Sequence, residues 1–242
     1  MEENPASMMK MMRDEMTVLV ENVIKILIDE KMLIVADKYA KDHIKADTHE
    51  TPIFQTNEYN NKLIGYLGQI AFKKFLTKNK NIRTDFPEVN MDGSPDIYDF
   101  NIKGFKIDVK TLLWNEYWED NTHPNWSIDP CHIITLVDLI TKFFFLIPQI
   151  QLNIDDFFNP SFNWKKKKNI PKDIYWALFL KKSNTGFIDS EVYIIGWCKY
   201  QDIIKANEKK QFFRFNPKYH TNIAIPLKEL NSNDDFFTLT KT

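Results

Sequence analysis

The chain has little cysteine, little glycine and almost no net charge. Its only cysteines, Cys131 and Cys198, are too few for a disulfide framework or a tetrahedral zinc site, so we expect two buried thiols. None of the six glycines belongs to a glycine-rich phosphate-binding loop. The net charge of −1 excludes a globally basic protein, so a nucleic-acid partner would have to meet a local basic patch.

A signal peptide and a long uninterrupted apolar run are also missing. Residues 131–147 form the most apolar stretch, but His132, Asp138 and Lys142 interrupt it and Pro148 ends it. This pattern predicts a buried helix, or a helix followed by a strand, and not a membrane span. The N-terminus lacks the basic-then-apolar order of a signal peptide. We therefore expect a soluble, cytoplasmic protein with no membrane partner.

What the chain does contain is a succession of segments with helical or strand periodicity. The predicted helices cover 8–46, 58–76 and 199–209, and the predicted strands cover 82–86, 97–102, 105–112, 174–180 and 192–197. This order predicts an α/β fold with a mixed β-sheet flanked by helices. The length suits an N-terminal helical region at 1–50 and one domain at 51–242. The first region is either an appended or dimerising unit or a set of helices packed on the same core.

The most informative residues lie around a predicted hairpin. Asp96 follows Pro95 just before the first strand, and Asp108 and Lys110 lie on the second. Because strand side chains alternate between faces, Asp108 and Lys110 share one face and the apolar residues between them share the other. Carboxylates are ligands for a hard cation, and a neighbouring ammonium can orient an attacking water or offset charge on a phosphate. This set predicts metal-dependent cleavage of phosphodiesters.

The register of the hairpin decides which aspartate faces Asp108. A strict two-residue loop at Lys103-Gly104 would place Asp99 opposite Asp108 and turn Asp96 to the other face. Asp96 reaches the site only through an odd-length loop, a bulge or a bend after Pro95. Asp99 is therefore the reserve candidate for a metal ligand, should Asp96 not reach the site.

Three segments between residues 65 and 111 match the pattern of one known family. They are Gly65-Tyr66-Leu67-Gly68-Gln69 on a predicted helix, Pro95-Asp96, and Asp108-Val109-Lys110. In these segments the chain resembles the PD-(D/E)xK nuclease superfamily, which has the restriction-endonuclease-like fold. The resemblance implies that Asp96 and Asp108 bind Mg²⁺, with the Val109 carbonyl as a third ligand. It also implies that Lys110 is the catalytic lysine beside the attacking water, and that Mn²⁺ can replace Mg²⁺.

One position departs from the family pattern. Helices of the Gly-x-x-Gly type usually continue with Glu, where this chain has Gln69. Its amide oxygen can accept a hydrogen bond or reach a metal, but it brings no charge. The departure implies weaker metal binding, or one ion instead of two.

We therefore expect a Mg²⁺-dependent nuclease that hydrolyses the phosphodiester bonds of nucleic acid. DNA is the expected substrate, cut as by an endonuclease, because most of the family that the chain resembles cuts DNA. The run Lys165, Lys166, Lys167 and Lys168 is either a phosphate-contacting patch or a solvated loop. The alternative function is a catalytically inactive nucleic-acid-binding or assembly protein that retains the fold. A homodimer would supply the two sites needed to cut both strands, but the sequence does not decide the oligomeric state.

Overall fold

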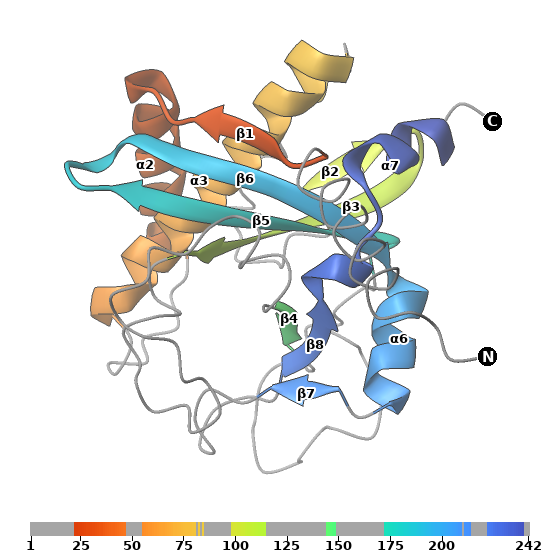
Figure 1. Cartoon of the computed structure of the whole chain (residues 1–242). Helices are drawn as coiled ribbons and strands as arrows, with labels where there is room; N and C mark the ends of the chain where they lie inside the picture. The colour runs from red at the N-terminus through yellow and green to blue at the C-terminus, as the bar shows by residue number, and fades with distance from the viewer. Residues whose placement is uncertain are drawn as a thin grey trace, which may run out of the picture.

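The computed structural model describes residues 22–46, 55–80, 82, 84, 98–114, 144–148, 172–209, 211–213 and 222–239. Within these ranges the chain forms a five-stranded sheet of order β1-β6-β5-β3-β2 and a three-stranded sheet of order β4-β8-β7 (Figure 1). The larger sheet contains β1 (Ile24–Leu27), β2 (Phe100–Ile102), β3 (Phe105–Leu113), β5 (Ile174–Ser183) and β6 (Gly186–Lys199). The smaller sheet contains β4 (Phe144–Pro148), β7 (Phe212–Phe213) and β8 (Asn222–Pro226).

Four α-helices accompany the sheets in the described part of the chain: α2 (Glu30–Ala46), α3 (Gln55–Lys80), α6 (Tyr200–Glu208) and α7 (Asn233–Leu239). Strand β3 runs parallel to β5, whereas β2–β3, β5–β6 and β1–β6 are antiparallel pairs. The larger sheet is therefore mixed, which confirms the predicted α/β class.

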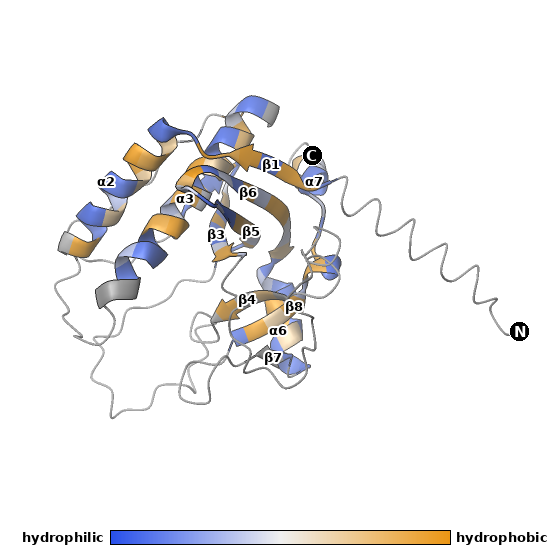
Figure 2. Ribbon diagram, turned by 60° about the vertical axis from the view of Figure 1, so that its left-hand side comes forward, coloured by the Kyte–Doolittle hydropathy of each residue, from blue (hydrophilic) through white to orange (hydrophobic). Residues whose placement is uncertain are grey.

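Apolar side chains cover both faces of the larger sheet. Helices α2 and α3 lie on one face, and α6 lies with β4 and β8 on the other (Figure 2). The first face is packed with aromatic residues, among them Phe72, Phe100 and Trp176, all at most 1% exposed. Cys198 is buried in the second cluster, as expected, and this burial raises the pKa of its thiol. Cys131 lies outside the described residues.

The helix predicted over 8–46 is wrong at Ile24–Leu27, which form strand β1. Ile24 pairs with Ile194 of β6, and Ile28 donates its N–H to Ser190 O at 2.9 Å. The apolar residues here suit a helix or a strand equally, and only the distant partner β6 decides between them. The helical prediction is confirmed for Glu30–Ala46, and residues 8–21 lie outside the described part.

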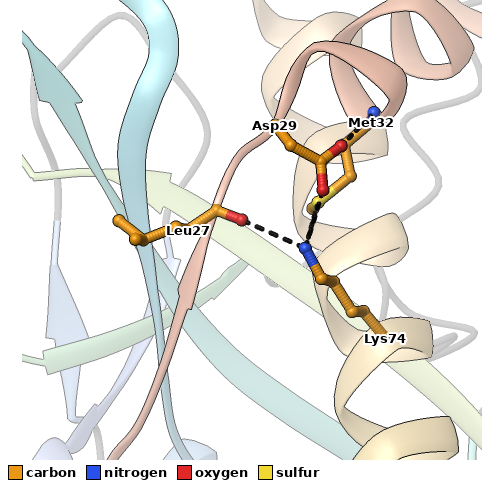
Figure 3. Close-up of polar contacts among 4 residues, drawn as sticks. All are labelled: Leu27, Asp29, Met32 and Lys74. Atoms are coloured by element: carbon orange, nitrogen blue, oxygen red, sulfur yellow. Dashed lines mark hydrogen bonds and ion pairs between the residues drawn. The ribbon is translucent and has the colours of Figure 1, made fainter.

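A polar junction ties β1 and α2 to helix α3 (Figure 3). Asp29 caps α2, since its Oδ1 accepts the Met32 N–H at 2.9 Å. Lys74 of α3 donates to Asp29 Oδ2 at 2.8 Å and to the Leu27 carbonyl at 3.4 Å. The hydrogen bond from Lys74 is the main reason why the pKa of Asp29 lies below its usual value. This junction anchors one end of the helix that carries Gln69.

Two predicted segments, 82–86 and 131–147, lie mostly outside the described residues. Of the apolar stretch at 131–147, only 144–147 are described, and they belong to strand β4. Residues 82 and 84 are the described part of the predicted strand 82–86, and neither is in a strand. Among the described residues, no helix is both long and apolar enough to cross a membrane.

Candidate active site at the edge of strand β3

The β2–β3 hairpin has the two-residue loop that the sequence raised as one alternative. Ile102 pairs with Phe105 and Phe100 pairs with Ile107, so Lys103-Gly104 is the whole loop. Lys103 has φ 53° and Gly104 has φ 90°, the left-handed values that a type I′ turn requires at both positions. This register, which ends at the Phe100–Ile107 pair, brings the preceding residue, Asp99, to the part of β3 that contains Asp108.

A backbone irregularity at Asp99 then directs its carboxylate. The Asp99 N–H donates to Ile107 O at 2.9 Å, and Ile107 is also the register partner of Phe100. Two residues against one is the arrangement of a β-bulge, which interrupts the regular alternation of faces. Asp99 Oδ2 consequently accepts the Val109 N–H at 2.5 Å. The carboxylate thus takes the place of the backbone carbonyl that a longer β2 would offer to Val109. Asp99 is 8% exposed, so this carboxylate is buried at the sheet edge.

Asp108 and Lys110 form an ion pair beside Asp99. Lys110 Nζ lies 2.8 Å from Asp108 Oδ2, and the two side chains are 26% and 11% exposed. Burial by itself lowers the pKa of Lys110, but the negative charges of Asp108 and Asp99 outweigh it and raise that pKa overall. Lys110 is therefore an ammonium at neutral pH. Because it responds to both carboxylates, the three side chains form one electrostatic cluster.

The Val109 carbonyl points toward the same edge as Asp99. In a β-strand the N–H and C=O of one residue point the same way, and successive residues alternate. Val109 directs its N–H to Asp99, whereas the Lys106 carbonyl accepts from Asp173 N at 2.9 Å on the β5 side. The carbonyl oxygen of Val109, which the resemblance implies as a third metal ligand, thus points to the same edge as the Asp99 carboxylate.

Helix α3 delivers Gln69 to this edge because it packs very closely on β3. A β-carbon at Gly68 would lie 1.7 Å from Thr111 Oγ1, so only glycine fits there. The neighbouring Gln69 donates its amide N–H to Asp99 Oδ1 at 2.9 Å. Asp99 therefore has a hydrogen bond on each carboxylate oxygen.

Tyr175 is a neighbour of the site that the sequence did not indicate. It lies beside Asp108 in the parallel register of β3 and β5. Burial, assisted by the charge of Asp108, raises the pKa of its hydroxyl, which accepts the Lys172 N–H at 3.3 Å. No local motif marks Tyr175, because its place depends on the pairing of two strands more than 60 residues apart.

The structure brings together Gln69, Asp99, Asp108, Val109 and Lys110. The other candidates, Asp96 and Lys165, Lys166, Lys167 and Lys168, lie outside the described residues. Within the described ranges no three His, Cys, Asp or Glu side chains cluster as a metal site. The oxygen donors around Lys110 are the carboxylates of Asp108 and Asp99, whose charges both raise its pKa, and the carbonyl of Val109 on the strand between Asp108 and Lys110. An all-oxygen set with few protein ligands fits Mg²⁺, which keeps several waters when bound.

Comparisons with protein-family models, curated proteins and solved structures found no significant match to this chain.

Proposed function

We propose that the protein is a Mg²⁺-dependent nuclease that hydrolyses phosphodiester bonds, with DNA as its substrate. The observation that supports this is the meeting of Asp99 with the Asp108–Lys110 pair at one sheet edge. Two carboxylates can hold a hard cation, and an ammonium beside them can meet a phosphate. The proposal includes the restriction-endonuclease-like fold implied by the sequence resemblance.

Asp108, Asp99 and the Val109 carbonyl would hold the cation. The resemblance adds Asp96, whose position is outside the described residues. When bound, such a cation stabilises charge on the phosphate and lowers the pKa of a coordinated water. Asp96 and Asp99 are alternatives for the second carboxylate. The hydrogen bond from the Val109 N–H places the Asp99 carboxylate beside β3, and a bulge at Asp99 is also one of the arrangements by which Asp96 could reach the site.

Lys110 acts as a hydrogen-bond donor in this proposal. Its raised pKa keeps the ammonium protonated, so it cannot accept a proton from water near neutral pH. The ammonium instead holds the attacking water in line, or donates to a phosphate oxygen as negative charge grows there. The ion pair with Asp108 fixes where that donor sits.

The state of the cluster also favours one alternative function. Asp99 is satisfied by Gln69 and Val109, and Asp108 is paired with Lys110, so these carboxylates have partners without a cation. This arrangement would suit a nucleic-acid-binding or assembly protein that keeps the fold but has no activity, because such a protein needs no cation at these carboxylates. Binding without cleavage would identify it.

Incubation with linear and circular double-stranded DNA in Mg²⁺, Mn²⁺ or EDTA tests the proposal. We expect cleavage that EDTA abolishes and that Asp108→Asn and Lys110→Met each reduce by about 100-fold or more, the usual cost of removing one such group. The matched control is Asp189→Asn, an exposed position with φ 60° that asparagine tolerates. Cutting of circles identifies an endonuclease. Cleavage that survives in EDTA or in Asp108→Asn would refute the proposed site.

A further inference from the structure

Two glycines of helix α3 have opposite surroundings. Gly68 is required because a β-carbon there would strike Thr111, whereas a β-carbon at Gly65 would meet no described residue within 4 Å. Glycine inside a helix is about 1 kcal/mol less favourable than alanine. Gly65 lies well inside α3, which runs from Gln55 to Lys80. Packing among the described residues thus explains why position 68 is glycine, but it does not explain the glycine at position 65.

The open space at Gly65 adjoins the proposed site. Residues four apart on a helix lie one above the other, so Gly65 and Gln69 share a flank of α3. Gln69 contacts Asp99, the buried carboxylate of the cluster. Lys62, three residues before Gly65, belongs to the same flank and lies 2.9 Å from His43 Nε2. We call Lys62, Gly65 and Gln69 the α3 flank.

We propose that one sugar–phosphate strand of the substrate packs against the α3 flank at Gly65. This inference rests on the proposed nuclease function and adds to it the path of the strand. The missing β-carbon lets a bulky strand approach the helix backbone closely. Lys62, whose Nζ contacts His43, places a positive charge one turn before the gap, which suits the negative phosphates. The gap also leads to Gln69, the residue that holds Asp99.

The test measures DNA binding and thermal stability in the full chain. A labelled duplex is titrated by fluorescence anisotropy in Ca²⁺, under conditions where gels show it uncut. The variants are Gly65→Ala and Gly65→Leu, and the control is Asn60→Ala, an exposed α3 position outside the flank. We expect Gly65→Leu to raise Kd by roughly tenfold, equivalent to about 1.4 kcal/mol. Gly65→Ala should raise Kd less and leave Tm unchanged or higher, because alanine favours the helix.

Three results would overturn the inference. Unchanged Kd in Gly65→Leu would show that the strand does not pass Gly65, while metal-dependent cleavage by the wild type would leave the proposed function standing. A lower Tm in Gly65→Ala would show that part of the protein itself fills the space. A wild-type protein that neither binds nor cuts DNA would refute both proposals together.

Discussion

The amide nitrogen of Gln69 lies 2.9 Å from Oδ1 of Asp99, although the two residues are 30 positions apart in the sequence. This contact joins helix α3 to the start of the β2–β3 hairpin. The Val109 N–H occupies the other oxygen of Asp99, so the carboxylate is held on both sides. A glutamate at position 69 would place a second carboxylate here. The neutral amide is therefore what allows α3 and Asp99 to meet without a cation.

Gln69→Glu should make the stability of the protein depend on pH and on Mg²⁺. Two adjacent carboxylates raise the pKa of one of them, so the variant binds an extra proton when folded. Its stability is then highest at mildly acidic pH and falls as pH rises through that raised pKa. We expect a loss of about 1–3 kcal/mol at alkaline pH, partly restored by Mg²⁺. Thermal unfolding across pH measures this.

The control for that experiment is Gln69→Ala, which removes the same hydrogen bond without adding a charge. It should destabilise the protein at every pH and show no recovery with Mg²⁺. Equal pH profiles for the two variants would contradict the close approach of position 69 to Asp99.

Asp99→Asn should separate the two candidate metal ligands. If Asp99 holds the cation, this variant loses cleavage by about 100-fold or more while keeping its fold, since asparagine can still accept the Val109 N–H. Asp96→Asn is the parallel variant. Cleavage assays at rising Mg²⁺ concentration compare the two. Full activity in Asp99→Asn with loss in Asp96→Asn would assign the ligand to Asp96.

Asp108→Asn should lower the pKa of Lys110. Burial lowers the pKa of Lys110, and the charge of Asp108 raises it more than the charge of Asp99 does. Because the folded pKa is raised, the stabilisation from Lys110 is complete below its unfolded pKa and is lost as pH rises through the folded pKa. In the variant that stabilisation should be smaller, and its loss should be complete at a lower pH. NMR titration of the Lys110 side chain measures the shift, with exposed Lys103 as the internal control. An unchanged titration would refute the pairing.

Gly68→Ala should destabilise the protein strongly. The new β-carbon would lie 1.7 Å from Thr111 Oγ1 and 2.8 Å from Thr111 Cβ, so α3 and β3 would have to separate. Overpacking of this kind costs about 1–3 kcal/mol, or more. Thr111→Ala removes the oxygen, which is buried without a hydrogen-bond partner among the described residues, and should be close to neutral.

The double variant should recover part of the loss, because its two changes act on one contact. Chemical denaturation of the four proteins in this cycle gives the coupling free energy. Strictly additive effects would contradict the close approach of α3 and β3. Gly65→Ala serves as the matched control on the same helix, since in the described part of the chain its β-carbon would meet nothing within 4 Å.

The sequence by itself determined the features that depend on neighbouring residues. A turn at Lys103-Gly104 flanked by alternating strands follows from backbone preferences, and it places Asp108 and Lys110 on one face. The helix over Tyr200–Glu208 also follows from local periodicity. The same local pattern was misleading at Ile24–Leu27, where pairing with β6 overrides a sequence equally suited to a helix.

Only the tertiary structure decided what surrounds those residues. The bulge at Asp99, its bonds to Gln69 and Val109, and the place of Tyr175 beside Asp108 all involve elements brought together by strand pairing and helix packing. Such contacts depend on the order of strands in the sheet and on the distance between α3 and β3. That order and that distance result from burying apolar faces across the whole chain, a balance that no single segment contains.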